Sequence, residues 1–262
     1  MNCENSYSKF ADLYDRLMSD VDYKERADYI CQLLDSCNIK PNGKSLYNPE
    51  SHPIIADLGC GTGTITIDLA ERGFEMIGID ISPEMLSQAM DKSIASGKRP
   101  LFLNQDMTCF ELYGTVDAVL CSLDGINHVT DENTLMEMFK CVENYLNPGG
   151  CFIFDINTEY KLKNVIGNNI FYEVYDDVVY LWQNELNERK KIVDFDLTFF
   201  FRNDSGLYER FDTTFSERIY SVSELSGFLA KANLKVMNIY GDMSFDAPGD
   251  KENRVFFIAL KI

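Results

Sequence analysis

The chain contains two histidines, and one of them, His128, stands where an enzyme could use it. It follows an apolar run, Val116–Cys121, after a short stretch that contains Asp124-Gly. An imidazole with an ordinary pKa near neutrality can take a proton from a hydroxyl or an amine, so His128 is a candidate general base. Asp124 is a weaker candidate for orienting an acceptor, because Asp-Gly is also a common turn. A turn histidine that bonds to the backbone is an equal alternative, and His52, in a polar stretch, is interpreted as structural.

The second chemical feature is a glycine-rich turn, Ile54-Ile-Ala-Asp-Leu-Gly-Cys-Gly-Thr-Gly63. An apolar strand that runs into closely spaced glycines and then a helix lets the backbone approach a ligand at the carboxyl edge of a parallel sheet. Asp80 ends the next apolar run, where a carboxylate can accept hydrogen bonds from ribose hydroxyls. Turn, helix and strand-end acid together favour a ligand with an adenosine group over a plain strand–helix turn.

The spacing of the glycines, with Asp57 before them, narrows the choice of ligand. Dinucleotide sites have the pattern G-x-G-x-x-G and present backbone amides to a pyrophosphate, whereas this chain has G-x-G-x-G. The Asp57 carboxylate would repel a phosphate but could hold an ammonium group. S-Adenosylmethionine has an amino acid end and no phosphate, so it is the cofactor that the motif predicts.

The stretch Asp57–Gly63 resembles motif I of the class I S-adenosylmethionine-dependent methyltransferases. Gly78-Ile-Asp-Ile-Ser-Pro-Glu-Met-Leu86 is similar to the ribose-binding strand end of that family, and Asn104-Gln-Asp-Met107 to its adenine loop. Leu146-Asn-Pro-Gly-Gly150 resembles the turn before its fifth strand. The resemblance covers residues 54–156 and implies these cofactor-binding residues: Asp57, Gly59, Cys60, Gly61, Asp80, Ile81, Asp106 and Met107.

The N-terminal segment Tyr7–Met18 resembles a part of small-molecule methyltransferases that folds over the cofactor. In that group a tyrosine reaches the methionine end, and the resemblance implies this role for Tyr14, with Tyr7 as second choice. Both tyrosines also fit the apolar stripe of an amphipathic helix, so a role in the core is an equal alternative.

Alternating strands and helices must position these motifs. Periodicity and capping signals predict helices at 23–37, 64–72, from Ser82-Pro83 onward, 131–146 and 221–231, and strands at 54–58, 75–80, 101–104, 116–121, 151–156, 234–240 and 255–262. The predicted fold class is α/β: a Rossmann-like, seven-stranded, mostly parallel sheet with helices on both faces. Between residues 170 and 219 apolar residues alternate without a helical period, which predicts an inserted antiparallel β meander.

This pattern divides the chain into two parts. Residues 1–157 and 220–262 form a cofactor-binding core with an N-terminal helical lid, and residues 158–219 form an insertion that covers the acceptor site. Alternate residues of a strand face away from each other, so only some of the following could line that site: Tyr172, Tyr175, Tyr180, Trp182 and Arg218. The strand edges of the insertion could also pair two copies, which leaves both a monomer and a homodimer open.

Composition excludes several classes of protein. The formal net charge is -18, and no dense basic stripe could overcome that field, so nucleic acid is not expected as a partner. No apolar stretch approaches the length of a membrane span. The eight cysteines are scattered without a C-x-x-C pair, and no His/Cys cluster has metal-ligand spacing, so no metal is expected. With no secretory signal visible at the N-terminus, the expected location is cytoplasmic.

The predicted function is methyl transfer from S-adenosylmethionine to a small-molecule acceptor. The stretch Cys121-Ser-Leu-Asp-Gly-Ile-Asn-His128 lacks the Asn/Asp-Pro-Pro-aromatic motif of DNA amino-methyltransferases, and the chain lacks the Pro-Cys of cytosine C5 enzymes. It resembles instead the N-methyltransferases of small amines such as nucleotide-linked amino sugars. The resemblance implies an amine acceptor with His128 as base. O-methylation of a small metabolite, an NAD-dependent oxidoreductase and a non-catalytic S-adenosylmethionine-binding protein are the alternatives.

Overall fold

A computed structural model describes residues 21–48, 50–203 and 205–262, and in it strands and helices alternate along the first half of the chain. The elements of this half are α2 (Tyr23–Ser36), β1 (Ile54–Leu58), α3 (Thr64–Arg72), β2 (Glu75–Asp80), α4 (Pro83–Ser96), β3 (Leu101–Asn104), β4 (Val116–Cys121), the 3-10 helix η1 (Gly125–His128), α5 (Glu132–Tyr145) and β5 (Leu146–Asn157). After an insertion the chain ends with α6 (Val222–Lys231), β10 (Leu234–Gly241) and β11 (Arg254–Lys261).

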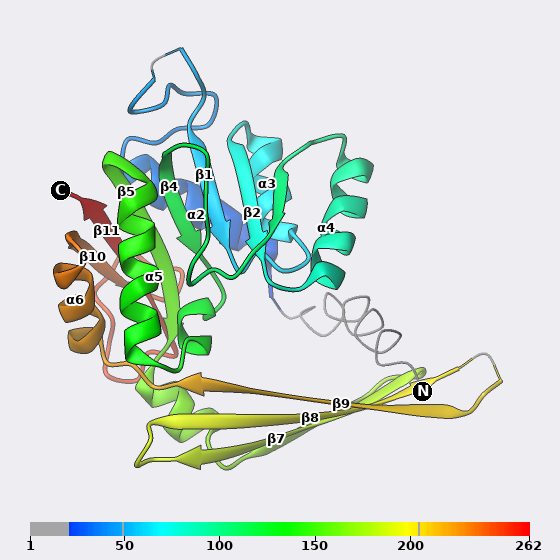
Figure 1. Cartoon of the computed structure of the whole chain (residues 1–262). Coiled ribbons are helices and arrows are strands. Elements are labelled where there is room, and N and C mark those ends of the chain that lie inside the picture. The colour runs from blue at the N-terminus through cyan, green and yellow to red at the C-terminus, as the bar shows by residue number, and fades with distance from the viewer. Residues whose placement is uncertain (1–20, 49, 204) are drawn as a thin grey trace.

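Seven strands form the central sheet, in the order β10-β11-β5-β4-β1-β2-β3 (Figure 1). Strands β1 to β5 pair in parallel, and β11 pairs antiparallel with both β5 and β10. Since all five parallel strands end at the same edge, the residues that follow them meet there. This arrangement confirms the predicted α/β fold class.

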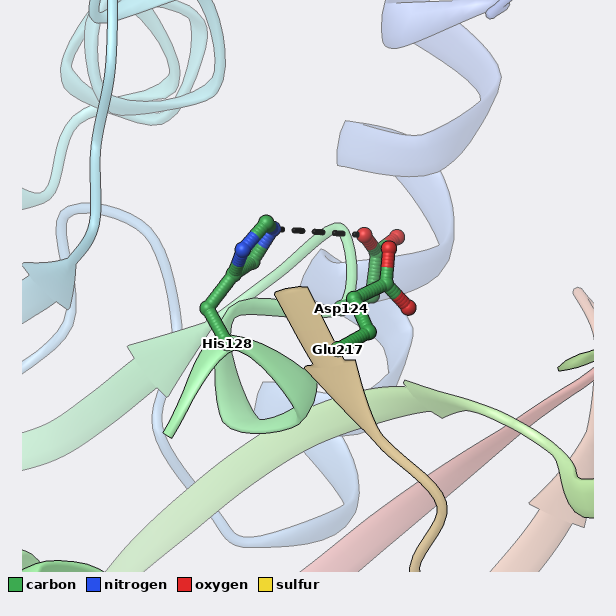
Figure 2. A group of neighbouring side chains, drawn as sticks. All are labelled: Asp124, His128 and Glu217. Atoms are coloured by element: carbon green, nitrogen blue, oxygen red, sulfur yellow. Dashed lines mark ion pairs between the residues drawn. The ribbon is translucent and has the colours of Figure 1, made fainter. Parts of the chain in front are cut away.

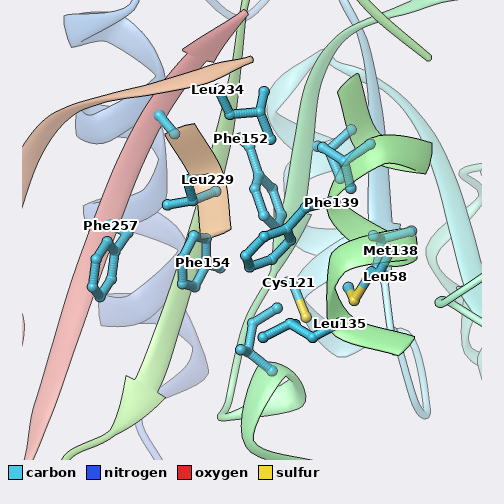
Figure 3. Close-up of a cluster of buried hydrophobic side chains, with 14 of the residues drawn as sticks. Leu58, Cys121, Leu135, Met138, Phe139, Phe152, Phe154, Leu229, Leu234 and Phe257 are labelled. Atoms are coloured by element: carbon cyan, nitrogen blue, oxygen red, sulfur yellow. The ribbon is translucent and has the colours of Figure 1, made fainter. Parts of the chain in front are cut away.

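Helices cover both faces of this sheet, which explains why its central strands are apolar at nearly every position. On one face, α5 and α6 pack against the strands, and Figure 3 shows the aromatic centre of this layer. The ring of Phe139 lies 5.8 Å from that of Phe152, and Phe154 stacks on Phe257 at 4.8 Å. On the other face, residues of α2 and α3 bury the opposite sides of β1, β4 and β5.

Local signals set the ends of several helices. Ser82 caps α4 by accepting a hydrogen bond from the Met85 N–H at 3.2 Å, and Pro83 follows it in the first turn. Gly73 ends α3 with a φ of 107°, a left-handed conformation that glycine adopts without strain. The predicted capping box is also present, because Ser221 and Glu224 exchange hydrogen bonds at the start of α6.

Strand β5 begins earlier than the predicted Cys151. Leu146 already pairs with Val116 of β4, and the register then shifts within Val116–Ala118. The Asn-Pro-Gly-Gly turn is therefore part of the strand rather than a separate stop.

The inserted segment builds a second sheet of four antiparallel strands in the order β6-β7-β8-β9, which confirms the predicted meander. These strands are β6 (Ile170–Val174), β7 (Val178–Asn187), β8 (Ile192–Arg202) and β9 (Tyr208–Arg218), preceded by a π-helix, η2 (Lys161–Ile166), that the sequence did not predict. A small core of its own holds this part together: Leu162, Ile166, Val193, Phe195 and Ile219. The long, twisted sheet runs across the carboxyl edge of the first one (Figure 1), and its strand β9 contacts η1 there.

Among the described residues, no helix combines the length and the apolar character needed to cross a bilayer. The predicted N-terminal helix, with Tyr7 and Tyr14, lies outside the described residues.

Candidate functional site

The glycine turn after β1 is tied to the neighbouring strand by its backbone. The amides of Gly59 and Cys60 both donate to the Ile79 carbonyl, at 2.8 and 3.0 Å. Gly59, Gly61 and Gly63 all have positive φ values, 68°, 56° and 72°, which other residues rarely adopt. A Cβ at Gly63 would lie 2.8 Å from that of Ala89, whereas a Cβ at Gly61 would meet nothing within 4 Å. Gly63 is thus needed for packing, and Gly61 borders open space.

Asp80 joins this turn to the start of α4. Its Oδ2 accepts the Gly61 N–H at 2.8 Å, and its Oδ1 accepts the Ser82 N–H at 2.9 Å. A carboxylate has about four lone-pair sites, so these two bonds leave acceptor capacity for ligand hydroxyls.

Asp57 is buried at the end of β1, where the Thr66 hydroxyl donates to its Oδ2 at 2.5 Å. Burial raises the pKa of this carboxyl to about 7, and the nearby charge of Asp80 acts in the same direction. A cation at the turn would restore the charged form of Asp57.

One cavity of about 420 Å³ collects the sequence motifs. All the predicted site residues that fall within the described range line it: Asp57, Gly59, Cys60, Gly61, Asp80, Ile81, Asp106, Met107 and His128. The volume is within the usual range of small-molecule sites. Its walls fit S-adenosylmethionine, because carboxylates stand at Asp57 and Asp80, and the exposed Ile81 and the half-buried Met107 are apolar.

The same cavity is lined by residues that sequence reasoning missed: Tyr23, Ser122, Leu123 and Gly125. The last three follow β4, and their position at the carboxyl edge is the signal that could have found them. Tyr23 begins α2, far from the motifs along the chain, and no local pattern marks it.

The loop after β4 has an unusual backbone. Leu123 and Asp124 both have left-handed φ values, 58° and 59°, which cost energy for residues other than glycine. Asp155 on β5 stabilises this turn, since its carboxylate accepts the amides of Leu123 and Asp124 at 2.8 and 3.2 Å. Arg254 on β11 donates to Asp155 and, at 2.6 Å, to the Asp124 carboxylate. This buried ion-pair network sets the position of η1.

His128 lies at the end of η1 and lines the cavity (Figure 2). Its Nε2 is 3.8 Å from Asp124 Oδ2, and its side chain is 40% exposed. On its other side the ring packs against Phe215 of β9, with 5.2 Å between the ring centroids.

Glu217, also on β9, completes a cluster with Asp124 and His128. One ligand atom from each residue can be chosen so that all three lie within 4.8 Å of one another. Glu217 is 3% exposed, and its Oε2 accepts the Asn157 Nδ2–H at 2.9 Å. Burial, and then the charge of Asp124, raise the pKa of Glu217 to about 8. The sequence had no signal for this residue.

The five insertion residues suggested as lining residues do not line this cavity, as far as the described residues extend. Trp182 stacks on Phe195 in the insertion's own core, at 6.0 Å, and Arg218 pairs with Glu132. Tyr172 is 68% exposed. The expectation that some of Tyr172, Tyr175, Tyr180, Trp182 and Arg218 line the acceptor side of the insertion stays a prediction, because alternate residues of each strand face opposite ways.

The raised pKa values of Asp57 and Glu217, about 7 and about 8, make stability depend on pH. In the unfolded chain both carboxyls titrate near pH 4. Between about pH 4 and pH 8 the folded state therefore holds protons that the unfolded state has lost, and the free energy of unfolding falls as pH rises.

As the pH rises from 5 to 8, we expect the free energy of unfolding of Glu217→Gln, measured by chemical denaturation, to fall less than that of the wild type. Glutamine keeps an acceptor for Asn157 and carries no charge. The exposed Glu137→Gln is the control and should follow the wild-type curve. Parallel curves for all three proteins would contradict the expectation.

Comparisons with known proteins agree with this geometry. Residues 55–150 match the protein family described as "Methyltransferase domain". The Bacillus subtilis (strain 168) protein named "Putative methyltransferase YqeM" is 34% identical over 258 residues, which cover 97% of this chain and 97% of that protein.

Solved structures extend the comparison. The crystal structure of a S-adenosylmethionine-dependent methyltransferase from Clostridium acetobutylicum ATCC 824 superposes with a TM-score of 0.84 at 33% identity, over 99% of each chain. The sugar N-methyltransferase KedS8 from Streptoalloteichus sp ATCC 53650 superposes with a TM-score of 0.76 over 95% of this chain and 92% of that one. At 18% identity, the second likeness shows the fold alone.

These matches decide between the alternatives for the cofactor. The Bacillus subtilis relative and the Clostridium acetobutylicum structure cover nearly the whole chain and are methyltransferases by name, and no feature of the glycine turn calls for a pyrophosphate. The oxidoreductase alternative is therefore set aside, and the chain belongs to the class I S-adenosylmethionine-dependent methyltransferases, enzymes whose cofactor is S-adenosylmethionine.

Proposed function

We propose that this enzyme methylates the nitrogen of a small-molecule amine and that His128 is the general base. The observation that carries the proposal is the position of His128. It lines the cavity of the glycine turn and stands beside two carboxyl groups, Asp124 and Glu217 (Figure 2). Carboxylates attract an ammonium group and have no comparable attraction for a neutral hydroxyl.

The cofactor-binding roles follow from the arrangement of the cavity. Asp57, Gly59, Cys60 and Gly61 would hold the amino acid end, since Asp57 suits an ammonium group and the glycines admit close approach. Asp80 and Ile81 would bind the ribose, and Asp106 and Met107 would frame the adenine. Tyr14 is proposed for the methionine end on the family resemblance alone.

S-Adenosylmethionine supplies a methyl group on a positively charged sulfur, which leaves as a neutral thioether when the acceptor nitrogen takes the methyl. The chain itself has three tasks: it aligns the nitrogen, excludes water and removes a proton. A protonated amine has no lone pair for attack, so its proton must leave first. The imidazole of His128 can accept that proton, because the ring lines the cavity and Asp124 would stabilise the imidazolium that forms.

The insertion, residues 158–219, is proposed to cover the acceptor site, with residues 1–157 and 220–262 as the cofactor-binding core. Phe215 supports this division, because it brings the insertion against His128. The fold shared with a sugar N-methyltransferase supports an amine acceptor. A net charge of -18 supports a small-molecule acceptor over nucleic acid as the partner.

The test is a screen for release of S-adenosylhomocysteine with small amines, including amino sugars, and with their hydroxyl counterparts. Turnover with amines is the expected result. Turnover with hydroxyl compounds alone would indicate O-methylation, and no turnover with tight cofactor binding would indicate a binding protein.

His128→Asn is expected to reduce kcat for the best amine at least about tenfold, the lower end for loss of a general base. Asparagine retains polarity but cannot take the proton. Affinity for S-adenosylhomocysteine, measured by calorimetry, should stay within a factor of about two. The control is His52→Asn, in the loop before β1, which should turn over like the wild type. An unchanged kcat in the His128 variant would remove this residue from the mechanism.

A further inference from the structure

We propose that Glu217, contributed by the insertion, binds the acceptor as an ammonium ion and selects amines over hydroxyl compounds. This inference rests on the proposed N-methylation and adds the residue that recognises the acceptor.

Strand β9 presents two useful side chains on one face, because residues two apart in a strand point the same way. Phe215 packs on the His128 ring, and Glu217 comes within reach of both His128 and Asp124. An aromatic face beside a carboxylate is a favourable environment for an organic cation.

One oxygen of Glu217 is available for a ligand. Its Oε2 is held by Asn157, while its Oε1 has no hydrogen-bond donor among the residues that the structure describes. Figure 2 shows the Glu217 carboxyl next to that of Asp124, across from the imidazole of His128.

The position of Glu217 is fixed by its neighbours. Asn157 donates to Glu217 through Nδ2, and its Oδ1 accepts from Lys161 at 2.8 Å and from Arg254 at 3.1 Å. The Asn157 N–H donates to Asn127 at 2.9 Å. Because both the Nδ2 and the Oδ1 of the Asn157 side chain are hydrogen-bonded, Asn157 is fixed in place and holds Glu217 in one preferred orientation.

The charges of the cluster leave room for one more cation. Three carboxyl groups, those of Asp124, Asp155 and Glu217, face two cationic side chains, Arg254 and Lys161. When Glu217 is ionised and the His128 imidazole is neutral, one negative charge is uncompensated, and a buried unpaired charge is costly. The raised pKa of Glu217 agrees with this, because without a cation the group prefers its neutral form.

A single positive charge suits this cluster better than a metal ion. Three ligand atoms within 4.8 Å could also approach a divalent cation. However, Arg254 donates directly to Asp124, and Lys161 lies beside Asn157, so two positive charges already surround the position. An ammonium group compensates the excess charge, whereas a divalent ion would exceed it.

The experiment compares the wild type with Glu217→Gln, Glu217→Asp and the surface control Glu137→Gln, using the best amine from the screen. We expect Glu217→Gln to raise the KM for that amine at least about tenfold, the range for a hydrogen bond to a charged group. We expect kcat to change less than KM, and the Kd for S-adenosylhomocysteine to remain within a factor of about two. Glu217→Asp keeps the charge, so its KM should lie between those of the wild type and Glu217→Gln. It provides a second test if the glutamine variant folds poorly.

The outcomes separate this inference from the proposed function. An amine substrate with an unchanged KM in Glu217→Gln would overturn the role of Glu217 and leave N-methylation intact. A wild type that methylates no amine would overturn both. Binding of Mn²⁺ by the wild type, its loss in Glu217→Gln and loss of turnover with EDTA would show that the cluster holds a metal, which also overturns the inference.

Discussion

Replacing Arg254 with methionine is expected to lower the free energy of unfolding by about 3–5 kcal/mol, the usual cost of removing one partner from a buried ion pair. The Arg254 side chain is 9% exposed and that of its partner Asp155 is fully buried. Methionine would fill much of the volume but leave the charges of Asp155 and Asp124 without their cation. Both carboxylates would then have to bind protons or draw water into the sheet.

Chemical denaturation at pH 7 would measure this effect. A suitable control is Arg210→Met, because Arg210 also pairs with an aspartate, Asp212, but both side chains are at least half exposed. Exposed pairs contribute about 1 kcal/mol or less. Equal losses of stability in the two variants would contradict the buried network as a source of stability. The loss of stability in Arg254→Lys should lie between those of the two methionine variants, since lysine keeps the charge but lacks the planar group that bonds to Asp155, Asp124 and Asn157 together.

Asp80→Ala is expected to weaken binding of S-adenosylhomocysteine about 100-fold, or about 2.7 kcal/mol. Two effects add up here. The ribose would lose the acceptor that we propose Asp80 provides, and the Gly61 and Ser82 amides would lose the acceptor that orients the glycine turn.

Calorimetry with the folded variant would test this prediction. Asp91→Ala is the control, because Asp91 is exposed on the neighbouring helix α4 and should bind the ligand like the wild type. Affinity retained in the Asp80 variant would show that the cavity binds its ligand in another orientation. Circular dichroism and the unfolding midpoint would establish that the fold is intact.

The sequence allowed most of the central sheet to be predicted, because local signals define its elements. The bounds of β1, α3, β2, β3 and β4 coincide with the prediction, since each is an apolar run or a periodic stretch followed by polar residues or glycine. The grouping of the candidate site residues around one cavity could be expected for the same reason. Its residues come directly after these strands, and parallel strands deliver them to a single edge.

The cluster of Asp124, His128 and Glu217, which we propose faces the acceptor, could not be predicted in the same way. Glu217 reaches His128 only because β9 pairs with β8 in one register and crosses the edge of another sheet. A shift of one residue would have turned its side chain to the opposite face. Trp182 was a reasonable guess for a lining residue by type, yet the insertion uses it to build its own core. The π-helix η2 likewise has no sequence signature.

The two hydrogen bonds of Asn127 suggest how such enzymes can change their acceptor during evolution. This buried side chain in η1 donates to the carbonyls of Asn157 and Arg218, at 3.2 and 3.0 Å, so it holds the points where the chain leaves the central sheet and returns to it. The four strands between these two points form one inserted unit, and Asn127 holds both of its connections to the central sheet. An exchange of residues 158–217 for the matching stretch of a relative would keep both connections and His128, while replacing the strands that we propose cover the acceptor site. New acceptor preferences could arise by such exchange without any change in the cofactor half.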